Sequence, residues 1–237
     1  MLEADPVLGR YIANYPSDRL RLLVPAAAVV LGIGVLLNYT VAEMQPFGPA
    51  LTVLLTAAVS LATGWRTLHF WNREVILYET GFTYREGGRT VYFIYEEIAA
   101  IRQQGEQLAY FGGLIRRAVY RFTLVTIRGE TLMLDNLYLH VDRLIAHIER
   151  QVYPRLEAAI QKRLAAGEAV PFSANLRLSA AGLLSDAGEL AWAEYGGAQV
   201  ANGTLRLLRG GETWLALPLP QVDNIPVLLN LLRTHKS

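Results

Sequence analysis

The side chains that could carry out chemistry in this chain are few, and they do not form a catalytic pattern. Ser173, Ser179 and Ser185 lack the flanking glycines of a nucleophile elbow. The chain contains no cysteine, which excludes a thiolate nucleophile, a cysteine metal site and a disulfide. No glycine-rich phosphate loop opens a helix after a strand. We therefore expect a protein that is not an enzyme and holds no cofactor.

The histidines and acidic residues have simpler interpretations than a reaction centre. His140 and His147 lie seven residues apart, about 10.5 Å along a helix axis, whereas two ligands of one metal on a helix lie four residues apart. We expect no metal site there, and an exposed or half-buried position for His147. Glu96, Glu97 and Glu194 follow predicted strands, where carboxylates usually cap backbone amides rather than act as acids and bases.

One stretch combines arginines with bulky apolar residues in a way that suits the interface of an anionic membrane leaflet. Each cation there contributes about 1 kcal/mol. We expect these residues to contact the membrane or a lipid headgroup. The alternative is that the apolar side chains pack on the C-terminal part of the chain or cover the open end of a barrel, with the arginines solvated. The cations are Arg116, Arg117 and Arg121, and the apolar wedge is Phe111, Leu114 and Ile115.

Two uncharged apolar runs dominate the N-terminal part of the chain. The run Leu22–Ala42 is 21 residues long, about 31 Å as a helix, which is enough to cross a hydrocarbon core. Only Glu43 separates it from the equally uncharged run Met44–Trp65. We predict a two-helix transmembrane hairpin over residues 22–65. The open alternatives are a signal peptide and a buried helix pair in a soluble core.

The charges beside the two runs predict how the hairpin is oriented. The loop between the runs has Glu43 and no lysine or arginine, so the positive-inside rule places both termini in the cytoplasm. The protein is then integral to the cell membrane, with two spans. Residues 1–21 have mixed charge and little to bury, and we expect this cytoplasmic segment to lie along the membrane surface. The flanking arginines are Arg10, Arg19 and Arg21 before the hairpin, and Arg66 and Arg73 after it.

From Glu74 onward the pattern changes to short runs of aromatic and β-branched residues with glycine-containing turns between them. This predicts an antiparallel meander, followed by a helix from Val141 that kinks or restarts at Pro154. The same order of signals returns in shorter form after Gly167.

The repeat predicts two copies of one module, over residues 73–166 and 167–237. In the matched signals, Gly81-Phe82 corresponds to Gly182-Leu183, and Val141-Asp142 to Val222-Asp223. The first copy carries extra residues around Gln103–Tyr120, which we predict to form a long hairpin or loop.

The stretch Tyr78-Glu-Thr-Gly81-Phe-Thr-Tyr84, followed by Tyr95-Glu96-Glu97-Ile98, resembles bacterial pleckstrin-homology-like modules. Trp192 and Asp223-Asn224-Ile225-Pro226 in the second copy are similar to an uncharacterised bacterial membrane-protein family with tandem modules of this kind. The resemblance covers nearly the whole chain. It implies a mainly β fold with helices, in which two modules, each a meander or barrel closed by a C-terminal helix, follow a transmembrane hairpin. It implies no activity.

The net charge of +1 provides no long-range field for nucleic acid, so we expect none as a partner. The expected function is a membrane-anchored binding or scaffold protein at the cytoplasmic face, contacting lipid headgroups or a protein partner. One alternative is a structural subunit of a membrane assembly, which associates with copies or partners through strand edges. The less favoured alternative is an enzyme whose site forms between the modules.

Overall fold

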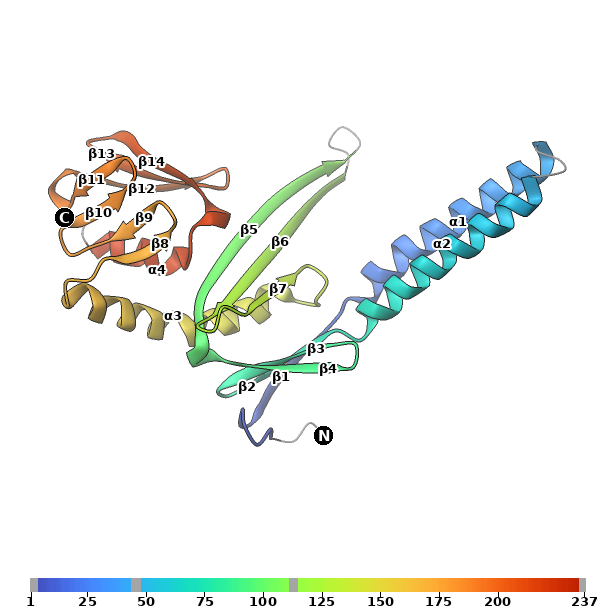
Figure 1. Ribbon diagram of the computed structural model, residues 1–237, viewed down its shortest axis with the longest axis horizontal. Coiled ribbons are helices and arrows are strands. Elements are labelled where there is room, and N and C mark those ends of the chain that lie inside the picture. Colours follow the sequence, from blue (N-terminus) through green and yellow to red (C-terminus); the bar gives the residue numbers. More distant parts are fainter. Residues whose placement is uncertain (1–3, 44–47, 111–114, 235–237) are drawn as a thin grey trace. The chain divides into compact units, whose positions relative to one another are not determined.

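The computed structural model describes residues 4–43, 48–110 and 115–234, while the side chains of residues 40–42, 48–49 and 105–120 lie outside the description. The chain forms two compact units. The hairpin unit comprises residues 1–93 and 137–140, and the C-terminal unit comprises residues 94–136 and 141–237. Figure 1 shows the elements of both units.

Two antiparallel helices, α1 (Arg19–Glu43) and α2 (Gly48–Trp71), dominate the hairpin unit. Both are long and apolar enough to cross a membrane. In their apolar stretches 0% and 6% of the residues are buried, so the apolar side chains face outward. Helices of a soluble core would bury these side chains, so the exposure argues against that alternative.

A four-stranded antiparallel sheet in the order β1-β2-β3-β4 completes the hairpin unit. Strand β1, which precedes α1, pairs with β2, which follows α2, so that Tyr15 lies opposite Val75. Leu8 just before β1 is fully buried. The expectation that residues 1–21 bury little was therefore wrong. Cleavage of a signal peptide within the hairpin would also remove β1 from this sheet. The strands are β1 (Tyr11–Pro16), β2 (Glu74–Tyr78), β3 (Gly81–Glu86) and β4 (Arg89–Ile94).

The C-terminal unit begins with a three-stranded antiparallel sheet of β5 (Ile98–Tyr110), β6 (Ile115–Thr126) and β7 (Thr131–Asp135). The backbones of β5 and β6 pair along their whole length, out to Tyr110 opposite Ile115, which confirms the long hairpin predicted from the extra residues. Helix α3 (Val141–Ala165) follows. It contains Pro154 and continues through it, so the predicted restart does not occur.

A four-stranded sheet, β11-β10-β9-β8, and a three-stranded sheet, β12-β13-β14, form the rest of the C-terminal unit with helix α4. Their apolar side chains share one core, to which Ile160 of α3 also contributes. The elements are β8 (Val170–Ser173), β9 (Leu176–Leu178), β10 (Gly182–Ser185), β11 (Gly188–Ala191), β12 (Tyr195–Ala201), β13 (Thr204–Arg209), β14 (Glu212–Pro218) and α4 (Ile225–Thr234).

The order of elements occurs twice along the chain, but the first copy takes its first strand, β1, from before the helical hairpin and so begins outside the predicted bounds of residues 73–166. Each copy has four strands, a three-residue 3-10 turn (Tyr95–Glu97 and Trp192–Glu194), three strands and a helix. The fold is mainly β with helices, but the sheets of the described residues do not join into a closed barrel, because each ends in unpaired edge strands.

The residues at which the final helices of the two copies correspond differ from those predicted. They begin at Val141 and Ile225, directly after His140 and Asn224, whose φ angles are 55° and 51°. Val141 therefore corresponds to Ile225 rather than to Val222. A 3-10 turn, Leu219–Gln221, precedes α4 in the second copy.

Candidate functional site

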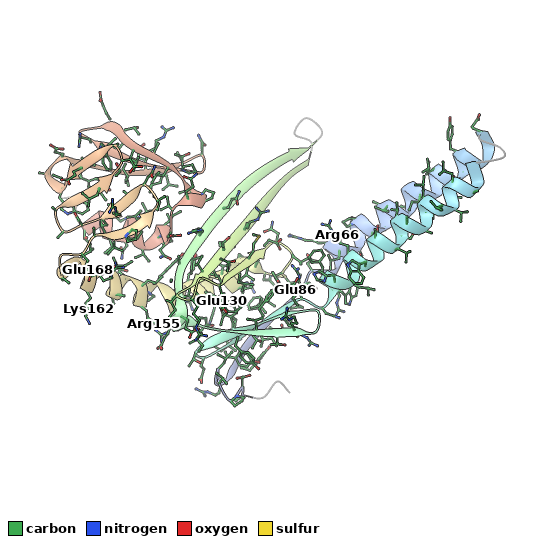
Figure 2. All side chains as sticks on the ribbon, viewed as in Figure 1. Arg66, Glu86, Glu130, Arg155, Lys162 and Glu168 are labelled. Carbon is green, nitrogen blue, oxygen red and sulfur yellow. The ribbon has the colours of Figure 1, made fainter. Side chains whose placement is uncertain are left out.

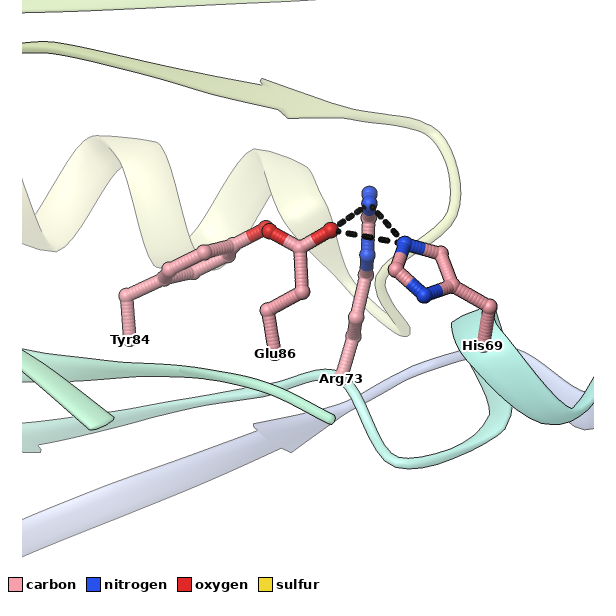
Figure 3. A network of polar contacts seen from close by, with 4 residues as sticks. All are labelled: His69, Arg73, Tyr84 and Glu86. Atoms are coloured by element: carbon pink, nitrogen blue, oxygen red, sulfur yellow. Dashed lines mark hydrogen bonds and ion pairs between the residues drawn. The ribbon is translucent and has the colours of Figure 1, made fainter. Parts of the chain in front are cut away.

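The end of α2 and the strand β3 are linked by four polar side chains, His69, Arg73, Tyr84 and Glu86 (Figure 3). The Glu86 carboxylate accepts a hydrogen bond from the Tyr84 hydroxyl at 3.0 Å and lies 3.0 Å from His69 Nε2. The Arg73 guanidinium donates to the same carboxylate and lies 3.5 Å from His69 Nε2. One carboxylate thus joins the helix end to the sheet.

The electrostatics of this network keep Glu86 ionised. Burial alone would raise the pKa of Glu86, but the hydrogen bond from Tyr84 and the charge and hydrogen bond of Arg73 outweigh it, so the pKa lies below its usual value. Burial raises the pKa of Tyr84, which therefore stays a neutral donor. A carboxylate with a lowered pKa and hydrogen bonds to both oxygens fits a structural tie better than a proton-transfer group.

The start of α1 is fixed to the same place. Ser17, which is 2% exposed, donates its backbone N–H to the Arg73 carbonyl and its hydroxyl to the Trp71 carbonyl, both at 2.9 Å. The Asp18 carboxylate accepts two backbone N–H groups of the first turn, at 3.1 and 3.3 Å, and so caps α1. Both helices therefore continue into paired strands without a flexible linker.

Arginines and aromatic rings surround this end of the hairpin, and we call Arg19, Arg66, Phe70, Trp71 and Arg73 the collar. The guanidinium carbon of Arg19 lies 5.1 Å from the Trp71 ring centre, and those of Arg66 and Arg73 lie 5.6 and 4.3 Å from the Phe70 ring centre. Figure 2 places Arg66 where the helices meet the sheet. Cations with amphipathic rings at the end of apolar helices are typical of a membrane interface.

The residues predicted to contact lipid are mostly outside what the structure describes. Arg121 is exposed on β6, opposite Asp135 of β7. The side chains of the other five lie outside the description, so membrane contact at this tip stays a prediction. Phe111 and Leu114 lie outside the described residues, and Ile115, Arg116 and Arg117 belong to β6 with side chains outside the description.

The histidine and glutamates that were considered as catalytic groups take part in packing and in ion pairs. His147 is half-buried, as predicted, 6.4 Å from the Tyr95 ring, and burial and Arg150 lower the pKa of this histidine. The three glutamates form ion pairs rather than the predicted amide caps, because arginines lie within reach of each. These pairs are Glu96–Arg155 at 3.3 Å, Glu97–Arg128 at 2.7 Å and Glu194–Arg209 at 3.2 Å.

Glu149 of α3 is a half-buried acid in the C-terminal unit, and it accepts hydrogen bonds from the Tyr153 hydroxyl at 3.0 Å and from the Gln103 amide of β5. Burial raises the pKa of Glu149, and the two hydrogen bonds offset only part of this. Among residues 4–43, 48–110 and 115–234, no group of three or more His, Asp or Glu side chains could hold a metal.

Asn224 attaches the start of α4 to strand β5, a role that was not predicted from the sequence. Its backbone N–H donates to the Ile101 carbonyl at 3.0 Å, and its side chain accepts from the Ile101 N–H at 2.9 Å and donates to the Ala99 carbonyl at 3.2 Å. Next to it, Asp223 pairs with Arg102 at 2.5 Å. The signal was an asparagine, which tolerates a left-handed backbone, just before a helix that opens with Ile225-Pro226.

The model of a family of unknown function (DUF6585) matches residues 3–237 of the chain. No curated protein and no solved structure matches the chain. The family description carries no fold or activity, so the likeness to bacterial pleckstrin-homology-like modules stays a prediction.

Proposed function

Because the chain belongs to the family of unknown function DUF6585, whose description assigns no activity, we propose a function from the structure of this member. The proposed function is that of a membrane-anchored, non-catalytic binding or scaffold protein. The observation that carries the proposal is the pair of helices whose apolar side chains face outward, such as Val35 and Leu61, which are 73% and 75% exposed. An apolar surface of this extent needs a cover, and a bilayer provides it.

The collar supports an orientation with both termini in the cytoplasm. Its arginines lie at one end of the hairpin, whereas Glu43 lies at the other end. Positive charge is retained on the cytoplasmic side of membrane proteins. The hydrogen bonds of Ser17 and the Glu86 network then hold the β-sheet directly beneath the membrane.

The repeated order of strands, turn, strands and helix supports a pair of pleckstrin-homology-like modules as the binding part of the molecule. In the second copy two sheets and α4 enclose a single core, which is the architecture expected of such a module. These modules present surfaces to lipid headgroups or to proteins at the cytoplasmic face.

The absence of cysteine makes a direct topology test possible. Glu43→Cys and Ala166→Cys each introduce one thiol at an exposed residue. In intact cells we expect a membrane-impermeant maleimide to label the first variant and not the second, and to label both after permeabilisation. The wild-type chain should stay in the membrane pellet after alkaline carbonate. Release by carbonate, or labelling of Ala166→Cys alone in intact cells, would contradict the proposal.

A protein partner is the second candidate, because the C-terminal unit has a groove beside an edge strand. The groove measures about 340 Å³ and lies between β12, at the edge of its sheet, and α4. An extended peptide could add to such an edge and place side chains in the groove. Val200 is 47% exposed there, so Val200→Arg should abolish copurification of the partner from native membranes without releasing the chain from them. The lining residues are Tyr195, Ala198, Val200, Leu229, Leu232 and Arg233.

A further inference from the structure

The two helices of the hairpin do not close against each other along their whole length. A groove of about 280 Å³ lies between them, and its walls are apolar or small. Gly64 lines it, and a Cβ built there would meet no atom within 4 Å. The walls are Ala26, Val29 and Val30 on α1, and Ser60, Thr63, Gly64, Thr67 and Leu68 on α2.

The helix geometry places two collar residues at one end of this groove. Arg19 precedes Ala26 by seven residues and Trp71 follows Gly64 by seven residues, which is two turns in each helix. Residues seven apart lie on the same face, about 10.5 Å along the axis. The Arg19–Trp71 contact at 5.1 Å joins the two helices at this level.

Arg19 has a charge that the protein does not neutralise. Within the described part of the chain it forms no ion pair, because Asp18 caps α1 and pairs with Arg21 at 3.2 Å. The contact with the Trp71 ring orients the guanidinium but leaves its N–H donors free for an anion. An oriented cation thus lies two turns from an apolar groove, on the same side of the hairpin.

We propose that this groove binds one anionic phospholipid, with an acyl chain between α1 and α2 and the headgroup phosphate on Arg19. The inference rests on the proposed membrane function and adds a specific lipid site to it. The apolar walls select an acyl chain, and the cation at the collar end selects a net negative headgroup. A free phosphate would use Arg19 and leave the groove empty, so the site is assigned to a lipid.

The test uses the full chain in phosphatidylcholine nanodiscs that contain a small fraction of a lipid with a photoreactive acyl chain. In one sample this lipid is phosphatidylglycerol, and in the other it is phosphatidylcholine at the same fraction. Mass spectrometry maps the crosslinks, and those on the groove walls are normalised to crosslinks elsewhere on the helices. We expect about fivefold more groove crosslinks with phosphatidylglycerol, since one cation near the surface contributes ~1 kcal/mol.

Matched variants separate the parts of the site. Arg19→Gln should remove the headgroup preference, while Arg19→Lys should retain it, because the charge is kept. Arg66→Gln makes the same change on a collar residue that lies against Phe70, two residues from Gly64 and therefore on another face of α2, and it should have no effect. Gly64→Leu should remove groove crosslinks with both lipids, whereas Gly32→Leu, which also adds a side chain into open space but outside the groove, should not.

The outcomes distinguish this inference from the proposed function. A wild-type chain that does not float with vesicles would overturn the membrane function, and the site with it. A chain that floats but shows equal groove crosslinking by the two lipids would overturn the site alone. The same holds if Arg19→Gln and Arg66→Gln give identical headgroup preferences.

Discussion

Replacing Asn224 with alanine should destabilise the C-terminal unit more than any other single change of a polar residue at a turn. Its side chain makes two hydrogen bonds to β5, with the Ile101 N–H and the Ala99 carbonyl. Asn224 is 5% exposed and Ile101 is 1% exposed, so the freed backbone groups would be buried without partners. The residue also has φ 51°, a left-handed conformation that asparagine tolerates better than alanine.

The expected magnitude follows from these contacts. Two hydrogen bonds contribute about 1 kcal/mol each, and the left-handed backbone costs alanine about 1 kcal/mol, so Asn224→Ala should lower the free energy of unfolding by about 3 kcal/mol. Asn202 is a matched control, because it has the same φ of 51° but is exposed in the β12–β13 turn. Asn202→Ala should lose only the backbone part, about 1 kcal/mol.

The assay is urea unfolding of the full chain in mild detergent, followed by fluorescence. Trp192 and Trp214 lie in the C-terminal unit and report its transition. The Ile101 amide should also lose its protection from hydrogen exchange in Asn224→Ala and keep it in Asn202→Ala. If the two variants lower the unfolding free energy equally, the link between Asn224 and β5 does not stabilise the unit and the reasoning is wrong.

Three further changes test the electrostatics and the packing. Folding lowers the pKa of Glu86, so this residue stabilises the fold above the usual carboxyl pKa and loses that effect in acid. Glu86→Gln should lower the free energy of unfolding by about 1 kcal/mol at pH 7 and match wild type at low pH, as measured by urea unfolding. The pKa of Glu149 is raised by burial, so stability falls as pH rises through its folded value; Glu149→Gln should be more stable than wild type at pH 7 and equal to it in acid. Gly182→Ala would place a Cβ 2.2 Å from the Leu190 carbonyl oxygen and should lower the melting temperature, whereas Gly188→Ala, with φ 107° and open space around it, should lower it much less.

The hairpin could be predicted from the sequence because it depends on composition alone. A run such as Leu22–Ala42 without charge leaves few other structures for the backbone. The β5–β6 hairpin could be predicted because the repeat supplied a shorter copy for comparison. Strand β1 could not, since its partner β2 follows only after two long helices, and nothing local connects the two.

The collar and the links between elements depend on distance in space rather than in sequence. The acid of the Glu86 network lies 17 residues from His69, and Asn224 lies 123 residues from Ile101. Contacts between residues this far apart in sequence cannot be predicted from their spacing along the chain. The arginines near the hairpin ends were found by their charge, but the stacking of Arg19 on Trp71 requires the two helices to be placed side by side.

The pairing of β1 with β2 across the hairpin also bears on how the protein is made. In the second copy the equivalent strands, β8 and β9, are joined by a turn of two residues, Ala174 and Asn175. In the first copy α1 and α2 stand where the second copy has this short turn. Its first strand must wait for both helices to be synthesised and folded back before its partner arrives. If the helices span a bilayer as proposed, their insertion brings the two strand ends together and becomes a step in folding the sheet.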